Sequence, residues 1–95
     1  MKNLENNENA IKKYYEDFKK DNPNVIMLFR DNDFYDVYED DIKEVKEVIK
    51  LCTQKKRKNG MKYLCFPRPA LDIYLPRLVR YGKRVAIVEY PIYKK

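Results

Sequence analysis

Hydrophobic and polar positions follow two different periods along this chain. Between residues 10 and 20 the apolar side chains recur three, four and seven residues apart, which places them on one face of a helix. Residues 24–30 (NVIMLFR) form a continuous apolar run of strand length, typical of a strand that is covered on both faces. Polar residues at 31–33 then favour a turn, and 34–38 (FYDVY) continues in extended form. The pattern therefore predicts a helix followed by a β-hairpin.

The middle of the chain repeats this order. Residues 42–52 carry apolar side chains at helical spacing, and Asp40 or Asp41 before them is a suitable N-cap. Next, residues 53–58 and 61–66 flank an Asn-Gly dipeptide, the strongest short signal for a hairpin with a two-residue type I′ turn. We therefore expect a second helix and a second hairpin.

A third helix and a last strand complete the predicted fold. Residues 70–81 have helical spacing and precede Gly82, a typical C-terminal stop, while 84–90 (RVAIVEY) is another apolar strand. The order α-β-β-α-β-β-α-β predicts an α/β (α+β) fold in which a mixed β-sheet of about five strands carries three packed helices. The polar residues 1–9 are expected to be a disordered leader before one domain that spans 10–95.

The charge of the chain is divided between its two halves. Residues 1–47 carry 8 basic and 13 acidic side chains, whereas residues 48–95 carry 13 basic and 2 acidic ones. The net charge of +6 therefore combines an acidic first half with a strongly basic second half. Such a separation favours an anionic partner for one surface, with nucleic acid the commonest candidate and an anionic membrane the second.

Composition also excludes several kinds of site. The chain has no histidine, which removes imidazole bases, Ser/His and Cys/His nucleophile pairs and Cys₂His₂ zinc sites. Cys52 and Cys65 are too few for a four-cysteine zinc site, and the expected hairpin places Cys65 opposite Gln54, a register that disfavours a disulfide. No apolar run has the length of a membrane span, and no signal segment follows Met1. We expect a cytoplasmic protein with free thiols and no cofactor.

Two segments of the chain resemble a known family. NPNVIMLFRDNDFYDVYEDD, followed by a helix, resembles the start of the mismatch-recognition domain of MutS, where a proline, a strand, a turn and a D-F-Y-E box occur in that order. FPRPALDIYLPRLVRYGKRVAIVEY is similar to the I-P-Y-H helix, the L-x-x-L-V-x-x-G turn and the V-A-I-C-E-Q strand of the same family. Together these matches cover roughly residues 10 to 90.

The resemblance implies that the domain binds DNA. In the family, the phenylalanine of the D-F-Y-E box stacks on a mispaired or unpaired base from the minor groove, and the nearby glutamate hydrogen-bonds that base. An apolar wedge selects weak pairs, since unstacking costs least where pairing is already broken. The basic second hairpin lies at the family's T-K-R segment and would contact phosphates. The implied DNA-binding residues are Phe34 as the wedge, Asp36 in the place of the glutamate, and Lys55, Lys56, Arg57 and Lys62 as backbone contacts.

The sequence departs from the family pattern at several positions. Asp36 is one methylene shorter than glutamate, Asn32 replaces a turn glycine, Pro69 replaces a histidine, and Pro76 stands at an ordinary helical position. The 95 residues also contain no G-x-x-x-x-G-K-[ST] phosphate loop, so ATP hydrolysis is not expected of them.

The same residues also allow roles that do not involve DNA. Phe34 could pack at a strand edge, and a lysine-rich hairpin can serve to prevent aggregation. A protein-interaction module could keep this fold without reading DNA. A metal-dependent nuclease would need the clustered carboxylates to hold Mg²⁺, although turn and cap chemistry accounts for most of them. These carboxylates belong to Asp31, Asp33, Asp36, Glu39, Asp40 and Asp41.

Among these functions we expect a non-enzymatic DNA-binding module without a cofactor. One domain of this size offers little contact area, so it should bind mismatched or distorted duplex DNA weakly on its own, at about micromolar affinity. A protein partner or self-association would strengthen that binding.

Overall fold

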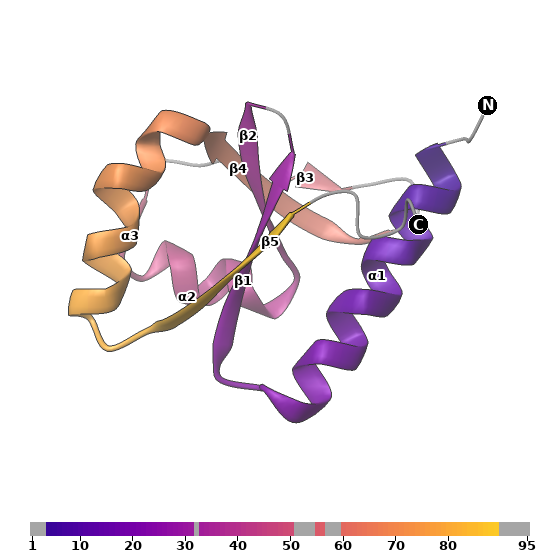
Figure 1. Ribbon diagram of the computed structural model, residues 1–95, viewed down its shortest axis with the longest axis horizontal. Coiled ribbons are helices and arrows are strands. Elements are labelled where there is room, and N and C mark those ends of the chain that lie inside the picture. The colour runs from indigo at the N-terminus through magenta and orange to yellow at the C-terminus, as the bar shows by residue number, and fades with distance from the viewer. Residues whose placement is uncertain (1–3, 32, 51–54, 57–59, 90–95) are drawn as a thin grey trace.

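The computed structural model describes residues 4–31, 33–50, 55–56 and 60–89 (Figure 1). Helices and strands follow one another in the predicted order. Their bounds are α1 Leu4–Asp21, β1 Val25–Asp31, β2 Phe34–Tyr38, α2 Asp40–Lys46, β3 Lys55–Lys56, β4 Lys62–Pro67, the 3₁₀ turn η1 Arg68–Ala70, α3 Leu71–Arg80 and β5 Arg84–Glu89.

The strands form one mixed sheet in the order β3-β4-β2-β1-β5. β1 pairs antiparallel with β2 and parallel with β5, while β4 pairs antiparallel with both β2 and β3. Figure 1 shows α1 on one side of this sheet and α2 and α3 on the other. The predicted α/β (α+β) class, with three helices packed on a mixed sheet, is confirmed.

Each face of the sheet has its own hydrophobic core. On the α1 side, Met27 and Phe29 of β1 pack with Ile11, Tyr15 and Tyr38. Residues 26–29 are at most 2% exposed, so β1 is covered on both faces, as its continuous apolar run predicts. The core on the side of α2 and α3 consists of Ile26, Leu28, Tyr35, Val37, Ile42, Val45, Ile49, Leu64, Phe66, Tyr74 and Leu78.

The first helix is longer than predicted. α1 begins at Leu4, so the expectation of a disordered leader over residues 1–9 is wrong for residues 4–9. Once a helix is nucleated, each added residue gains a hydrogen bond at little further cost, and residues 4–9 contain neither glycine nor proline to stop it. Helix propagation therefore outweighs the low hydrophobicity of this segment.

The cap and the end of α2 also differ from the prediction. Glu39 precedes the helix and makes no side-chain cap hydrogen bond. Neither Asp40 nor Asp41 is the cap, because both lie in the first helical turn. The helix ends at Lys46, well before residue 52, in a tight turn in which the N–H of Val48 donates to the Val45 carbonyl at 3.0 Å. Such a turn satisfies carbonyl groups at a helix end.

The second hairpin forms in a register one residue away from the predicted one. Lys56 pairs with Lys62, whereas the register that places Cys65 opposite Gln54 would shift this pair by one position. An odd number of residues therefore connects the paired positions, which excludes the two-residue turn that the Asn-Gly dipeptide predicts; Gly60 has a φ of 88°. Cys65 is a free thiol, and the other cysteine and Gln54 lie outside the described residues.

The third helix closes as its sequence predicts. α3 starts after η1, continues through Pro76 and ends before Gly82, whose φ is 82°. The N–H of Lys83 donates to the carbonyl of Leu78 at 3.0 Å, a bond that a left-handed residue after the helix makes possible. This turn brings the chain into β5.

Candidate nucleic-acid interface

Phe34 is an exposed aromatic residue at the tip of the sheet. It begins β2 directly after the first turn and pairs with Asp31 on β1 and with Pro67 on β4. Its side chain is 46% exposed, in contrast to the other residues of β2, which are all buried. Pro67, Pro69 and Phe34 line a shallow hollow at this tip. Asp33, Arg68 and Asp72 also line the hollow, so an exposed ring lies here beside both apolar and charged groups and is able to stack on a flat ligand.

Asp36 lies two residues further along β2 and therefore on the same side of the sheet as Phe34. It is only 3% exposed, and it accepts a hydrogen bond from the hydroxyl of Tyr38 at 3.2 Å. Its neighbours across the sheet are Phe29 and Cys65. The carboxylate therefore faces the interior in this structure, and contact with a base would require it to leave that position.

The basic hairpin lies at the other end of β4 from the wedge. Lys62 is exposed at the start of β4, five residues before Pro67, which is about 17 Å along a strand. Lys55 and Lys56 form β3 beside this end. Their side chains, and Arg57 and Asn32 as a whole, lie outside the described residues.

The two groups of predicted contacts also point to opposite faces of the sheet. Tyr38 lies four residues after Phe34 and therefore on the same face, and it packs in the core on the α1 side. Leu64 lies two residues after Lys62, again on the same face, and it packs in the core of α2 and α3. The structure thus brings Phe34 and Asp36 together on one face and leaves Lys62 on the other.

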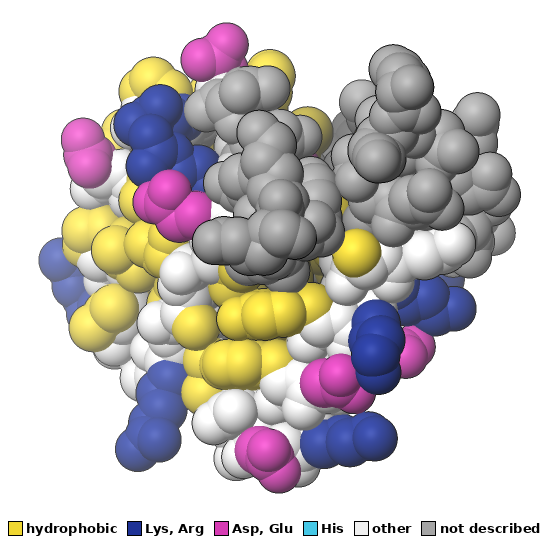
Figure 2. All heavy atoms as spheres, turned by 45° about the vertical axis from the view of Figure 1, so that its right-hand side comes forward, with side chains coloured by type: hydrophobic (Ala, Val, Ile, Leu, Met, Phe, Trp, Pro, Cys, Tyr) yellow, Lys and Arg dark blue, Asp and Glu magenta, His cyan; other side chains and the backbone are white. Residues whose placement is uncertain are grey.

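Basic side chains do not form a continuous patch on the face shown in Figure 2. Lys and Arg side chains there are spread around the rim, with Asp and Glu side chains between them, and hydrophobic side chains gather in the middle. Ion pairs account for part of this mixing: Lys13 lies 3.3 Å from Asp17, and Arg30 lies 2.9 Å from Glu89.

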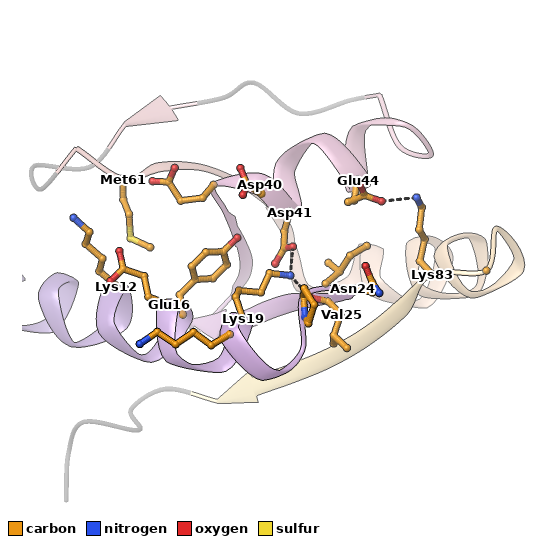
Figure 3. A pocket seen from close by; sticks show the side chains of 16 residues that line it. Lys12, Glu16, Lys19, Asn24, Val25, Asp40, Asp41, Glu44, Met61 and Lys83 are labelled. Atoms are coloured by element: carbon orange, nitrogen blue, oxygen red, sulfur yellow. Dashed lines mark hydrogen bonds and ion pairs between the residues drawn. The ribbon is translucent and has the colours of Figure 1, made fainter.

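Three of the carboxylates considered for a metal site, those of Asp36, Glu39 and Asp41, accept hydrogen bonds within the fold. Asp41, which is 2% exposed, accepts hydrogen bonds from the Lys19 ammonium at 2.6 Å and from the Met27 N–H at 3.0 Å. Burial raises the pKa of Asp41 above its usual range, although both of these donors oppose the rise. Figure 3 shows Lys19 reaching from α1 to Asp41 at the start of α2, and Lys83 reaching Glu44. Among the residues that the structure describes, no three potential ligands converge to hold a metal ion.

Arg68 is a cation near Phe34 that the sequence patterns did not single out. It follows Pro67, it is exposed, and it lines the same hollow as Phe34. Its backbone N–H donates to the carbonyl of Asp33 at 2.7 Å, which ties η1 to the turn before the wedge. Only the pairing of β2 with β4 reveals this proximity, because 34 residues separate Phe34 and Arg68 along the chain.

Comparison with known proteins agrees with this fold. Residues 9–92 match the sequence model of the family described as MutS domain I. This chain belongs to the MutS domain I family. The DNA mismatch repair protein MutS of Parabacteroides distasonis is 44% identical to it over 86 residues, and that of Phocaeicola vulgatus is 45% identical over 83 residues. The MutS of Porphyromonas gingivalis is 40% identical over 86 residues.

These matches cover most of this chain but only a small part of each relative. They cover 86%, 83% and 86% of this chain but only 9% or 10% of each MutS protein. The chain thus spans about a tenth of the length of these relatives. Membership of the MutS domain I family, suggested by the D-F-Y-E-like and V-A-I-x-E segments, is confirmed by the match over 9–92.

Proposed function

We propose that this MutS domain I binds duplex DNA that contains a mismatch or a local distortion, with Phe34 as a wedge. The observation that carries the proposal is the 46% exposed ring of Phe34 at the tip of the sheet, beside a hollow and next to a cation. Phe34 belongs to neither core of the described residues, and it stands at the phenylalanine of the family's D-F-Y-E box, which supports a role in binding.

The wedge would act by insertion between base pairs. Separating two stacked pairs costs roughly a few kcal/mol, and that cost is least where hydrogen bonding between the bases is already broken. Phe34 would therefore favour mismatches over matched sites without reading a sequence. Arg68 beside it, and Lys55, Lys56 and Lys62 at the far end of β4, would contact phosphates, and we propose the same role for Arg57.

Asp36 would join this site only after a rearrangement. Its carboxylate would have to exchange the Tyr38 hydroxyl for a base donor, a movement over a short distance since Asp36 and Phe34 lie on the same face. We assign Asp36 the part of a hydrogen-bonding group that accepts only from exposed base edges.

The proposed binding is non-enzymatic, requires no cofactor, and is weak for one domain. Phe34, Arg68 and the hairpin offer a small contact area, so we expect about micromolar affinity at physiological salt. A protein partner or a second copy would increase it. No helix among the described residues is both long and apolar enough to cross a membrane, and we propose the cytoplasm as the place of action.

One observation favours a second candidate, a protein-interaction module. Ile73 and Val79 of α3 are each 57% exposed, and Ile87 on the edge strand β5 is 44% exposed. Exposed apolar residues of this kind can take part in protein contacts.

Fluorescence anisotropy with matched, mismatched and bulged duplexes tests the wedge. We expect the wild type to bind the mismatched and bulged duplexes several-fold more tightly than the matched one. Phe34→Ala should remove most of that preference, because the stacking of one aromatic ring contributes about 1–3 kcal/mol. Tyr81→Ala is the control, since Tyr81 is an exposed aromatic residue after α3. Equal affinity for all three duplexes, unchanged by Phe34→Ala, would exclude the wedge.

A further inference from the structure

A group of lysines surrounds a hollow between α2 and the start of β4. Lys43 and Lys46 come from α2, Lys50 from the segment after it, and Lys62 from β4. All four are exposed. We call these four residues the α2 lysine surface. It lies on the face of the sheet opposite to Phe34 and about 17 Å away along β4.

These lysines have no carboxylate partners within the described part of the chain. Ion pairs there engage Lys13, Lys19, Arg30 and Lys83, and none engages the α2 lysine surface. Three carboxylates also line the hollow. Glu39 accepts the N–H of Lys62 at 3.0 Å, Glu47 accepts from the Lys83 ammonium at 3.0 Å, and Asp40 is exposed.

The hollow therefore holds four cations beside three carboxylates, and one of these carboxylates, Glu47, forms an ion pair with Lys83 outside the group. Lys43 and Lys46 lie three residues apart on α2, a spacing that places two cations next to each other on a helix. Lys62, at the start of β4, lines the same hollow and is exposed. An anionic ligand would reduce the repulsion between these cations.

The backbone fixes the position of Lys62 relative to α2. The N–H of Glu39 donates to the Lys62 carbonyl at 3.0 Å, and the Lys62 N–H donates back to the Glu39 side chain. Glu39 has a φ of 48°, a conformation that is costly for a residue with a Cβ atom. The two hydrogen bonds hold it there, so the start of α2 and the start of β4 form one unit that presents these lysines together.

We propose that the α2 lysine surface binds the phosphate backbone of duplex DNA, at a stretch separate from the base pair that Phe34 contacts. A separation of about 17 Å corresponds to about five base pairs of duplex. The two surfaces would therefore contact different stretches of one duplex. The proposal rests on the proposed DNA-binding function, but it does not depend on the wedge.

The test compares two double variants with equal net charge. Lys43→Gln with Lys46→Gln removes two cations from the α2 lysine surface, and Lys12→Gln with Lys20→Gln removes two exposed cations from α1. Affinity for a matched duplex and for a mismatched duplex is measured by fluorescence anisotropy at three salt concentrations. Circular dichroism should show that both variants are folded, since none of the four side chains is buried.

We expect the α2 variant to lose about tenfold in affinity for both duplexes alike, and its log–log salt slope to fall by about 2, one unit per lost phosphate contact. The α1 variant should change less than about twofold. Equal losses in both variants would mean that only net charge matters and would overturn the proposal. No loss in the α2 variant would overturn it as well, for instance if this surface binds an acidic protein instead.

The failure of this proposal and the failure of the wedge are distinguishable. If Phe34→Ala leaves the mismatch preference unchanged while the α2 variant weakens all binding, the wedge is wrong and the α2 lysine surface stands. If Phe34→Ala abolishes the preference while the α2 variant binds normally, the wedge stands and the proposal for the α2 lysine surface is wrong. If the wild type binds no DNA at all, both are wrong.

Discussion

The two ends of β4 offer different chemistry to a ligand. At its last residue, Pro67 lies beside the exposed ring of Phe34 and an apolar hollow, whereas its first residue, Lys62, belongs to a group of cations without ion pairs among the described residues. The first end suits a flat, apolar base, and the second suits a charged backbone. One end of β4 would then set the preference for mismatched over matched DNA, and the other end would set the overall affinity for DNA. The two properties should respond to different substitutions.

Two phenylalanines on neighbouring strands give the largest contrast in stability. Phe29 is fully buried in the α1-side core, and Phe34 is 46% exposed. Phe29→Ala should lower the free energy of unfolding by about 3–5 kcal/mol, because it leaves a cavity, whereas Phe34→Ala should cost less than about 1 kcal/mol. Urea denaturation measures both. A large loss in Phe34→Ala would mean that Phe34 is a packing residue and not a free wedge.

Substitution of Asp41, at the start of α2, should have the next largest effect on the free energy of unfolding. Asp41→Ala removes the partner of Lys19, whose side chain is 17% exposed, and of the buried Met27 N–H. We expect a loss of about 3 kcal/mol in the free energy of unfolding, mostly from the uncompensated ammonium group. Asp40→Ala, at an exposed neighbouring position, should cost less than about 0.5 kcal/mol. Equal effects of the two variants would contradict the structural role of Asp41.

The same carboxylate should give the fold a pH dependence. Since burial raises the pKa of Asp41 in the folded state, the folded protein retains this proton to a higher pH than the unfolded chain does. The part of the stability that is linked to this proton is therefore complete below the ordinary pKa of 3.8 and is lost as the pH rises through the raised value, while the hydrogen bonds to Lys19 and Met27 remain. Thermal unfolding from about pH 3 to about pH 8 should show this loss in the wild type and in Asp40→Asn, and its absence in Asp41→Asn.

Substitution of Tyr38 should have the smallest effect on mismatch preference, and it tests the role proposed for Asp36. Tyr38→Phe removes the hydroxyl that donates to Asp36 and should cost about 1 kcal/mol of stability. It also removes one of the groups that hold the carboxylate, so the preference for mismatched DNA should persist or increase up to about twofold. Tyr74→Phe, in the opposite core, is the control. A preference that disappears in Tyr38→Phe alone would show that Asp36 acts only in its buried position.

Much of the fold follows from periodicity, because helical and extended spacing depend on neighbours along the chain. The order of elements, the interior position of β1 and the glycine stop before β5 were all predictable in this way. The role of Asp41 was not. As an acid at the start of a helix it is expected to cap, yet long-range contacts with Lys19 and Met27 determine where its carboxylate lies.

The candidate site was predictable only in part, for the same reason. Resemblance identified Phe34, and the structure places it in an exposed position. The proximity of Arg68 depends on the pairing of β2 with β4, which no local pattern encodes. The face to which Lys62 points depends on strand register, and a shift of one residue reverses it.

A double-mutant cycle on mismatched and matched duplexes tests the separation of preference from affinity most directly. The cycle combines Phe34→Ala with Lys43→Gln and Lys46→Gln and is measured by fluorescence anisotropy. For sites this far apart the losses in binding free energy should add to within about 0.5 kcal/mol, and only Phe34→Ala should change the ratio of the two affinities. A coupling above about 1 kcal/mol, or a ratio that changes with the lysines, would contradict the account.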